Sequence, residues 1–444
     1  MGAADRTHSG SLRLTTLATV AAILAGAASA SAQAIPTDGR FALFTNFSTR
    51  ERAVDGESDD FTEIIAMLSL SGDQPDGLFE YALDARVATY PSSERDERIS
   101  LYEAYLGLHS RDRRWNLRLG QMWLGELGGL ASVAGLHAEY RQQEATALGR
   151  WRFGLFAGWE LEHYDTDLVD DVEKGGVYAA LDGDRGRQHI LGYVRIRNQG
   201  LTERSVVVFN NFIPFSRSLT LYQALQYDTE GPAGLGDAEL SYIFGNLRWR
   251  ISRAVELQGT YHRGQSVDAR TIADDVINGR PVSPEQLDGL LFESARARVM
   301  VRPLRWLSVW AGYANDRNNR TDDSSDRLQL GASARRLFGI PLDLTVTTSQ
   351  TDRGDDSYDS LWASIGYALG AKVYLSLDYN DTLSVYHISD GDGGTIEVRP
   401  DSERFSLSGN VNINRTFSLL LTLEHVDHSD FTEDRALAGL IVRF

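Results

Sequence analysis

The sequence predicts an all-β fold: a transmembrane antiparallel β-barrel of about 22 strands, within a range of about 18 to 24. Three observations lead to this prediction. The chain ends on an aromatic residue, many segments alternate between apolar and polar side chains, and the connections between those segments are alternately short and long.

The last ten residues form an alternating segment with one apolar face. Leu440, Val442 and Phe444 share that face, whereas Gly439 and Arg443 fall on the other. An aromatic residue at the end of the closing strand of a barrel lies at a membrane interface. The segment resembles the C-terminal insertion signal of outer-membrane β-barrel proteins. This resemblance implies that Leu440, Val442 and Phe444 form the insertion signal, that the barrel-assembly machinery is a partner, and that the source is a Gram-negative bacterium.

The first residues have the pattern of a secretory signal peptide. Arg6 and Arg13 supply positive charge, 14–28 is apolar, and small residues around Ala32 and Ala34 suit cleavage. The predicted organisation is therefore a signal peptide at 1–34 and an outer-membrane β-barrel at 35–444, with no N-terminal plug domain. No later run of about 18 apolar residues suggests a transmembrane helix.

Composition narrows the class of protein. The chain has no cysteine, which excludes disulfides, thiolate metal sites and covalently attached c-type haem. Neither a cofactor nor a metal ion is expected. The formal net charge of −18 argues against nucleic acid as a partner. Charged residues make up 24% and hydrophobic residues 42%, an average typical of a barrel in which half of each strand faces water.

Alternation with a period of two runs through much of the chain. Clear examples are 79–87, 151–161, 255–261 and 328–334. Segments of about ten residues fit tilted membrane strands with one face toward lipid and one toward a wet lumen. A soluble β-sandwich or propeller also contains alternating strands. The terminal Phe444, the aromatic residues near strand ends and the lack of a blade-length repeat favour the membrane barrel.

The connections alternate between two kinds. The short ones are 72–77, 111–114, 303–305, 339–341, 370–372 and 414–415. The longer ones are acidic: 51–60, 165–174, 316–326, 351–359 and 389–402. Short periplasmic turns and longer outer loops are typical of outer-membrane barrels. The pattern predicts an even number of strands, with both chain ends in the periplasm.

Two segments are candidates to narrow the lumen. Residues 264–290 form a long non-alternating stretch with a helix-like start at Ser283, and the sequence leaves open whether they fold inward as a constriction loop or remain a solvated outer loop. Residues 121–135 are apolar and rich in glycine, with Glu126 as the single charge. Both differ from the other loops enough to suggest a role of their own.

The flanks of 121–135 carry a resemblance. Arg118-Leu119-Gly120-Gln121 and the alternating strand that starts at Gly135 resemble a motif shared by alginate-export-like porins and the barrels of porin–cytochrome conduits. Gln121 stands where that motif has arginine, and Ala134 stands where it has aspartate. The resemblance implies a large porin-like barrel and names no substrate.

Seven arginines on three segments are predicted to line the lumen. The candidates are Arg195, Arg197, Arg248, Arg250, Arg296, Arg298 and Arg302. Inward arginine rows attract anions. Alternatively, they pair across strands with Asp237, Glu239 and Glu293, which would leave little net field.

The function predicted from these observations is passive passage of small hydrophilic solutes through an outer-membrane porin-like channel. One alternative is a barrel that sheathes a periplasmic multihaem cytochrome, and another is a polysaccharide exporter. No enzyme is expected, because no nucleophile motif accompanies the scattered histidines. Outer-membrane lipid and lipopolysaccharide are the expected surroundings.

Overall fold

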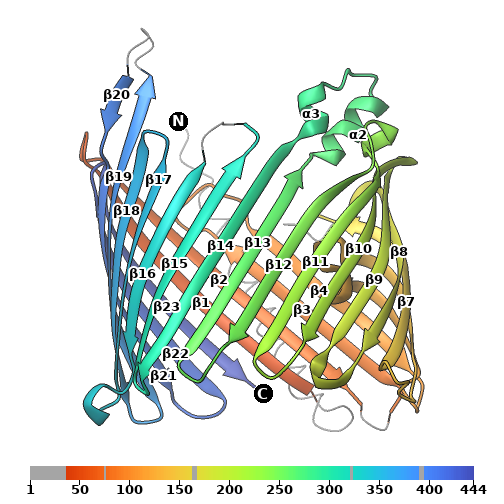
Figure 1. Ribbon diagram of the computed structural model, residues 1–444, viewed down its shortest axis with the longest axis horizontal. Helices are drawn as coiled ribbons and strands as arrows, with labels where there is room; N and C mark the ends of the chain where they lie inside the picture. The colour runs from red at the N-terminus through yellow and green to blue at the C-terminus, as the bar shows by residue number, and fades with distance from the viewer. Residues whose placement is uncertain (1–36, 75–76, 163–167, 321–323, 390–394) are drawn as a thin grey trace, which may run out of the picture.

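The computed structural model describes residues 37–444 except 75–76, 163–167, 321–323 and 390–394. The predicted signal peptide, 1–34, lies outside the described residues. Within them, strands dominate and form one closed wall (Figure 1). None of the described helices is long and apolar enough to cross a membrane.

The wall is a closed antiparallel barrel of 22 strands in the described part of the chain, which confirms the predicted fold class. Each strand pairs with the next along the chain, and β1 pairs with β23. A further short strand, β20 (Thr395–Val398), pairs only with the end of β19. The other strands are β1 (Thr37–Arg52), β2 (Ser58–Asp73), β3 (Phe79–Thr89), β4 (Arg98–His109), β5 (Trp115–Trp123), β6 (Ser132–Arg141), β7 (Arg150–Leu161), β8 (Leu168–Asp182), β9 (Gln188–Asn198), β10 (Leu201–Pro214), β11 (Leu219–Glu230), β12 (Glu239–Arg250), β13 (Val255–Ser266), β14 (Leu290–Leu304), β15 (Leu307–Asn318), β16 (Ser325–Ala334), β17 (Leu342–Arg353), β18 (Asp356–Leu369), β19 (Val373–Ser389), β21 (Asp401–Asn412), β22 (Phe417–His428) and β23 (Phe431–Arg443).

The seam between β1 and β23 closes the barrel. Its register runs from Arg40 opposite Arg443 to Arg52 opposite Phe431. The backbone N–H of Phe444 donates to the carbonyl of Gly39 at 3.0 Å. The Phe444 ring lies so close to Gly39 that a Cβ there would be 2.2 Å from it. Glycine at position 39 therefore makes room for the terminal aromatic ring.

The two faces of the wall differ in polarity. Large apolar side chains stand exposed on the outer face, as Leu419, Leu421 and Leu423 of β22 illustrate. Ser408 and Thr422 of neighbouring strands instead hydrogen-bond on the inner face at 3.0 Å. Such a continuous apolar exterior is unfavourable in water and suits hydrocarbon, whereas the backbone polar groups are satisfied in the closed ladder.

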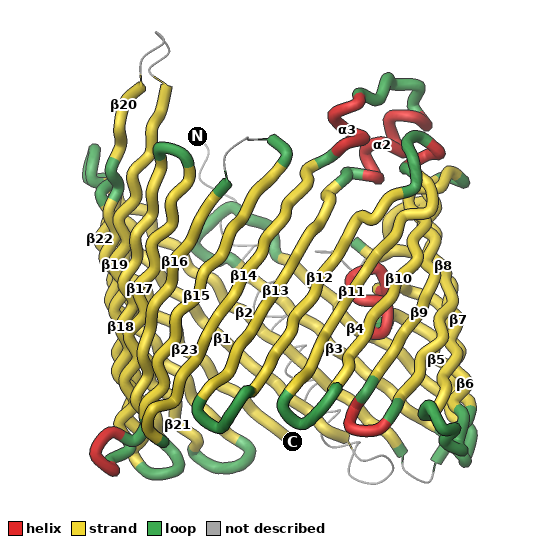
Figure 2. Tube along the Cα trace, viewed as in Figure 1, coloured by secondary structure: helices red, strands yellow, loops and turns green. Residues whose placement is uncertain are grey.

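The two rims of the barrel also differ. One, termed here the short-turn rim, carries the tight turns and the C-terminus (Figure 2). The other, the long-loop rim, carries the five acidic connections that were predicted to lie on the outer side. The connections contain short helical segments: η1 (Gly125–Ala131), η2 (Asp184–Gly186), η3 (Pro232–Gly234), α2 (Ala269–Ile277), α3 (Pro284–Asp288) and η4 (Leu337–Gly339).

Candidate functional site in the barrel lumen

The connection between β5 and β6 folds into the barrel, and its residues 124–131 are termed here the interior segment. It contains η1, which is drawn inside the wall behind β10 and β9 (Figure 2). Gly128 has a φ of +64°, a conformation that glycine adopts without strain, and it allows the segment to turn. Leu127 is completely buried. Within the apolar, glycine-rich stretch at 121–135, residues 124–131 therefore lie on the inner face of the wall, whereas 121–123 and 132–135 belong to β5 and β6.

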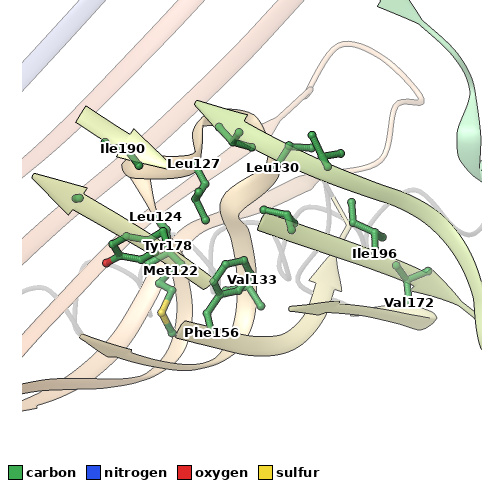
Figure 3. Close-up of a cluster of buried hydrophobic side chains, with 14 residues drawn as sticks. Met122, Leu124, Leu127, Leu130, Val133, Phe156, Val172, Tyr178, Ile190 and Ile196 are labelled. Atoms are coloured by element: carbon green, nitrogen blue, oxygen red, sulfur yellow. The ribbon is translucent and has the colours of Figure 1, made fainter. Parts of the chain in front are cut away.

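The interior segment packs on an apolar patch of the inner wall (Figure 3). Leu124, Leu127 and Leu130 contribute from the segment, and a Cβ at Gly192 of β9 would lie 2.2 Å from Leu127 Cδ2. The absence of a side chain at Gly192 therefore leaves room for the Leu127 side chain. The wall contributes Met122, Val133, Phe156, Val172, Tyr178, Ala180, Ile190, Val194, Ile196, Val206 and Val208.

A polar network ties the interior segment to the wall. The guanidinium of Arg152 on β7 donates to Glu126 of the segment at 2.7 Å, to Glu139 on β6 at 3.0 Å and to Asp182 on β8 at 2.6 Å. The Tyr178 hydroxyl donates to Glu139 at 2.5 Å and lies 3.1 Å from Nε2 of His137. His137 and Glu139 are each 2% exposed. These hydrogen bonds satisfy the buried charge of Glu139 and hold the interior segment against the wall.

A second segment crosses part of the long-loop rim. Helix α2 belongs to the connection between β13 and β14, yet it packs against β9 and β10 (Figure 1). Ile272 and Ala273 are fully buried in this contact. Asp268 caps the helix by accepting from the backbone N–H of Thr271 at 3.1 Å. The amide of Asn198 on β9 donates to Asp274 at 2.9 Å.

Charged contacts fix α2 in this position. Arg270 pairs with Glu160 of β7 at 3.0 Å and with Glu203 of β10 at 3.3 Å. Burial disfavours the charged guanidinium, but these two carboxylates outweigh burial and raise the pKa of Arg270 above its ordinary value. The sequence left open whether 264–290 folds inward or remains solvated. The structure places α2 against the inward-facing residue Asn198 at the mouth, and so this helix is a fixed lining of that mouth.

Five of the predicted arginines face the lumen. On β14, Val299 and Val301 stand exposed on the outer face, so the alternating residues Arg296, Arg298 and Arg302 face inward. On β12, Leu247 and Trp249 are on the outer face, which places Arg248 and Arg250 inward. The side chains of Arg248, Arg250 and Arg296 are about half exposed. We term these five residues the arginine wall.

Carboxylates do not balance the arginine wall. Arg248, Arg250 and Arg302 all share Glu256 of β13, at 2.8, 3.8 and 3.6 Å. Arg296 lies 3.7 Å from Asp316, and Arg298 stacks on the Trp310 ring with its guanidinium carbon 4.9 Å from the ring centroid. Five positive groups thus face two carboxylates. Glu293, expected to neutralise this row, bonds instead to Tyr261 and Arg317.

The inward placement predicted for Arg195 and Arg197 is wrong. On β9, Val194 and Ile196 are buried against the interior patch, and Leu191 is exposed on the outer face. Alternation therefore puts Arg195 and Arg197 outside, near the long-loop rim, where Arg195 bonds to the Thr202 hydroxyl at 2.7 Å. The physical reason is that the interior segment packs on the inner face of β9. That face is therefore apolar, and the charged residues of the strand lie on the outer face.

Two lumen residues were not singled out from the sequence. Arg327 of β16 faces the lumen and donates to Thr351 at 3.1 Å, and Trp310 supports Arg298. Arg327 contributes with Gln258, Thr260, Arg296, Arg298 and Gln329 to a recess of about 360 Å³ in the wall. The polar face of 327–335 was visible in the alternation, but cross-strand register was needed to bring Arg327 beside Arg296.

Similar folds occur among solved structures. No protein-family model and no curated protein matches the sequence. Acinetobacter baumannii OccAB4 is 11% identical, with 93% of this chain and 99% of that chain covered and a TM-score of 0.40. Pseudomonas aeruginosa OpdQ is 7% identical, with coverages of 92% and 98% and a TM-score of 0.40. The PapC chain of an E. coli P pilus tip assembly intermediate is 11% identical, with coverages of 91% and 61% and a TM-score of 0.51.

The likeness to PapC concerns the fold, and this chain spans about three fifths of the length of that usher chain. Together with the closed 22-stranded wall and its apolar exterior, it agrees with the large porin-like barrel expected from the sequence. The chain therefore has the fold of a large outer-membrane β-barrel.

Proposed function

We propose that this protein is a passive channel of the bacterial outer membrane that conducts small hydrophilic solutes, with a preference for anions. The arginine wall carries the proposal. The side chains of Arg248, Arg250 and Arg296 are about half exposed inside a closed barrel, which is the state of charges that face a water-filled lumen. Buried charges with so few partners would be costly.

The preference for anions follows from the imbalance of charge. Four of the five guanidinium groups share two carboxylates and the fifth, that of Arg298, stacks on Trp310, so the wall has a net positive potential where the lumen passes it. The interior segment and α2 cover the inner face of β7 to β10 and bring solutes closer to the arginines. Charge near a narrowed path selects ions more strongly than the same charge in a wide one.

Planar-bilayer recording of the refolded full chain tests this proposal. We expect stable ohmic steps and a reversal potential that shows anion selectivity in a potassium chloride gradient. The double variant Arg296→Gln/Arg298→Gln should lose much of that selectivity. Arg195→Gln/Arg197→Gln is the matched control, because it removes the same charge from the outer face. A silent barrel, or equal selectivity in all three proteins, would refute the proposal.

The outer surroundings of the channel are part of the same proposal. The long-loop rim is acidic and would face outward, where divalent cations link carboxylates to lipopolysaccharide phosphates. Leu440 and Val442 on the outer face of β23, together with Phe444 just after the strand, would be recognised by the barrel-assembly machinery. The alternatives, a sheath for a multihaem cytochrome and a polysaccharide exporter, gain no supporting contact in the described residues, and the interior segment reduces the room that either cargo needs.

A further inference from the structure

The outer wall is hollowed where β5 to β10 approach the short-turn rim. The hollow is a groove of about 720 Å³, within the size range of small-molecule sites. Two small side chains open it. Ala138 lies opposite Leu155, and Ala179 lies opposite Phe153 and Leu191. The larger outward neighbours that wall the groove include Trp115, Tyr140, Phe153, Leu155, Leu191 and Tyr193.

The groove is apolar along its length and polar only at one end. The Tyr193 hydroxyl is already paired with Ser205 at 2.6 Å. The indole N–H of Trp115 and the hydroxyl of Tyr140 have no hydrogen-bond partner within the described chain, and their rings lie 4.9 Å apart near the short-turn rim. Amphipathic aromatic side chains of this kind mark the boundary between hydrocarbon and headgroups. The groove therefore runs from that boundary into the apolar belt.

Positive charge lies just beyond the aromatic end. The strands that form the groove are joined at this rim by short turns, which carry the exposed side chains of Arg111, Arg185 and Arg187. Among the described residues, none of these three has an ion pair. Alternation from Leu191 places Arg187 on the outer face, directly below β9. Cations below an apolar groove complement a ligand with a phosphate attached to a hydrocarbon chain.

We propose that this groove binds one acyl chain of an anionic phospholipid from the leaflet at the short-turn rim. Arg111, four residues before Trp115, would bind the headgroup phosphate, while Trp115 and Tyr140 contact the glycerol region. Arg187, at the β9 side of the groove, would add positive potential at the same rim. The proposal needs the barrel in a membrane and is independent of what the lumen conducts. A phospholipid is the proposed ligand because the groove is apolar and ends near arginines that have no ion pair among the described residues. A phospholipid has an apolar acyl chain and a negatively charged phosphate in the same arrangement.

Lipid retention by the refolded full chain tests the proposal. Native mass spectrometry from detergent would compare phosphatidylglycerol with phosphatidylcholine of the same acyl chains. We expect one phosphatidylglycerol to bind at least tenfold more tightly. Ala179→Phe fills the groove and should abolish retention of that lipid, whereas Ala311→Phe, on the outward face of β15, is the matched control. Ala138→Phe fills the same groove from β6 if the first variant folds poorly.

The charge is tested separately. Arg111→Gln/Arg187→Gln should weaken phosphatidylglycerol to the level of phosphatidylcholine, while Arg415→Gln, in the turn between β21 and β22, should leave it unchanged. Three results would overturn the proposal: equal affinity for the two lipids, undiminished retention in both groove-filling variants, or a stable oligomer of this chain that covers Trp115 and excludes lipid.

Discussion

At the scale of single residues, buried polar groups fix the inner architecture. Glu139 is 2% exposed and accepts from Tyr178, Arg152 and Arg141. Each partner comes from a different part of the wall, and Arg152 carries the network on to Glu126 of the interior segment. One carboxylate thus connects β6, β7 and β8 with the segment that narrows the lumen. Removing a donor from such a network leaves buried charge less satisfied.

Tyr178→Phe tests the contribution of this network. The change removes the hydroxyl that donates to Glu139, and we expect it to lower the free energy of unfolding by about 1–2 kcal/mol. Tyr313→Phe is the matched control, because the Tyr313 hydroxyl donates to Asp326 at 2.5 Å in an exposed position and should matter by less than about 0.5 kcal/mol. Guanidinium unfolding of the barrel in detergent measures both. Equal losses would contradict a special role for Glu139.

At the scale of elements, two connections depart from the usual outer loop and line the interior. The interior segment is held mainly by apolar burial, with Leu127 at its centre. Helix α2 is held mainly by ion pairs and one amide contact. The two attachments should therefore respond to different substitutions, and each allows a test in which the barrel itself is left intact.

Leu127→Ala should loosen the interior segment. The lost burial and the cavity cost about 2–5 kcal/mol of attachment, and so we expect larger and noisier single-channel currents together with new protease cleavage within 124–131. Leu328→Ala removes the same side chain from the lipid-facing side of β16 and serves as control. Unchanged currents in Leu127→Ala would show that the segment does not limit conduction.

Arg270→Gln should release α2 from the wall. Glu160 and Glu203 would then face each other, and among the described residues Lys174 would remain as the cation beside them, at 3.5 Å from Glu160. We expect a higher open-channel conductance and faster proteolysis between β13 and β14. Arg280→Gln is the control in the same connection, because Arg280 pairs with Asp275 of its own connection at 2.8 Å and is well exposed. Identical conductance in both variants would contradict the assignment of α2 as a lining of the mouth.

At the scale of the whole molecule, closure depends on the seam between the first and last strands. The Phe444 ring occupies the space above Gly39, and any side chain there displaces it. Gly39→Val should therefore lower the folded yield several-fold when the chain is refolded into lipid vesicles, as measured by heat-dependent gel mobility. Gly245→Val, where an added Cβ meets open space, should fold normally. Equal yields would show that the terminal ring contributes little to closure.

Much of this architecture follows from local sequence pattern. Alternation and the terminal Phe444 predicted the barrel, and the connection lengths predicted its two unlike rims. The inward face of β9 did not follow. Both faces of that strand are apolar in part, because Leu191 meets the exterior while Val194 meets the interior segment. Polarity alone then cannot orient Arg195 and Arg197, and only contacts far apart in the sequence decide it.

The lumen is a similar case of partial prediction. The rows at Arg248 and Arg296 were visible because both strands alternate cleanly, with Leu247 and Val299 on the lipid side. The sequence did not predict that three arginines would contact Glu256, because this contact depends on the register between β12, β13 and β14. The packing of α2 against β10 requires the connection between β13 and β14 to fold across the mouth. No local pattern in the sequence of that connection indicates which strand the helix contacts.

The interior segment and α2 lie on the same side of the barrel, and this placement has a mechanical consequence. From β5 to β10 the wall is backed by a second layer of packed side chains, which resists bending as a braced shell does. The β1–β23 seam lies away from that brace. Lateral pressure from the bilayer will therefore deform the barrel unevenly. The side from β5 to β10 keeps its curvature, whereas the side that carries the seam bends more easily.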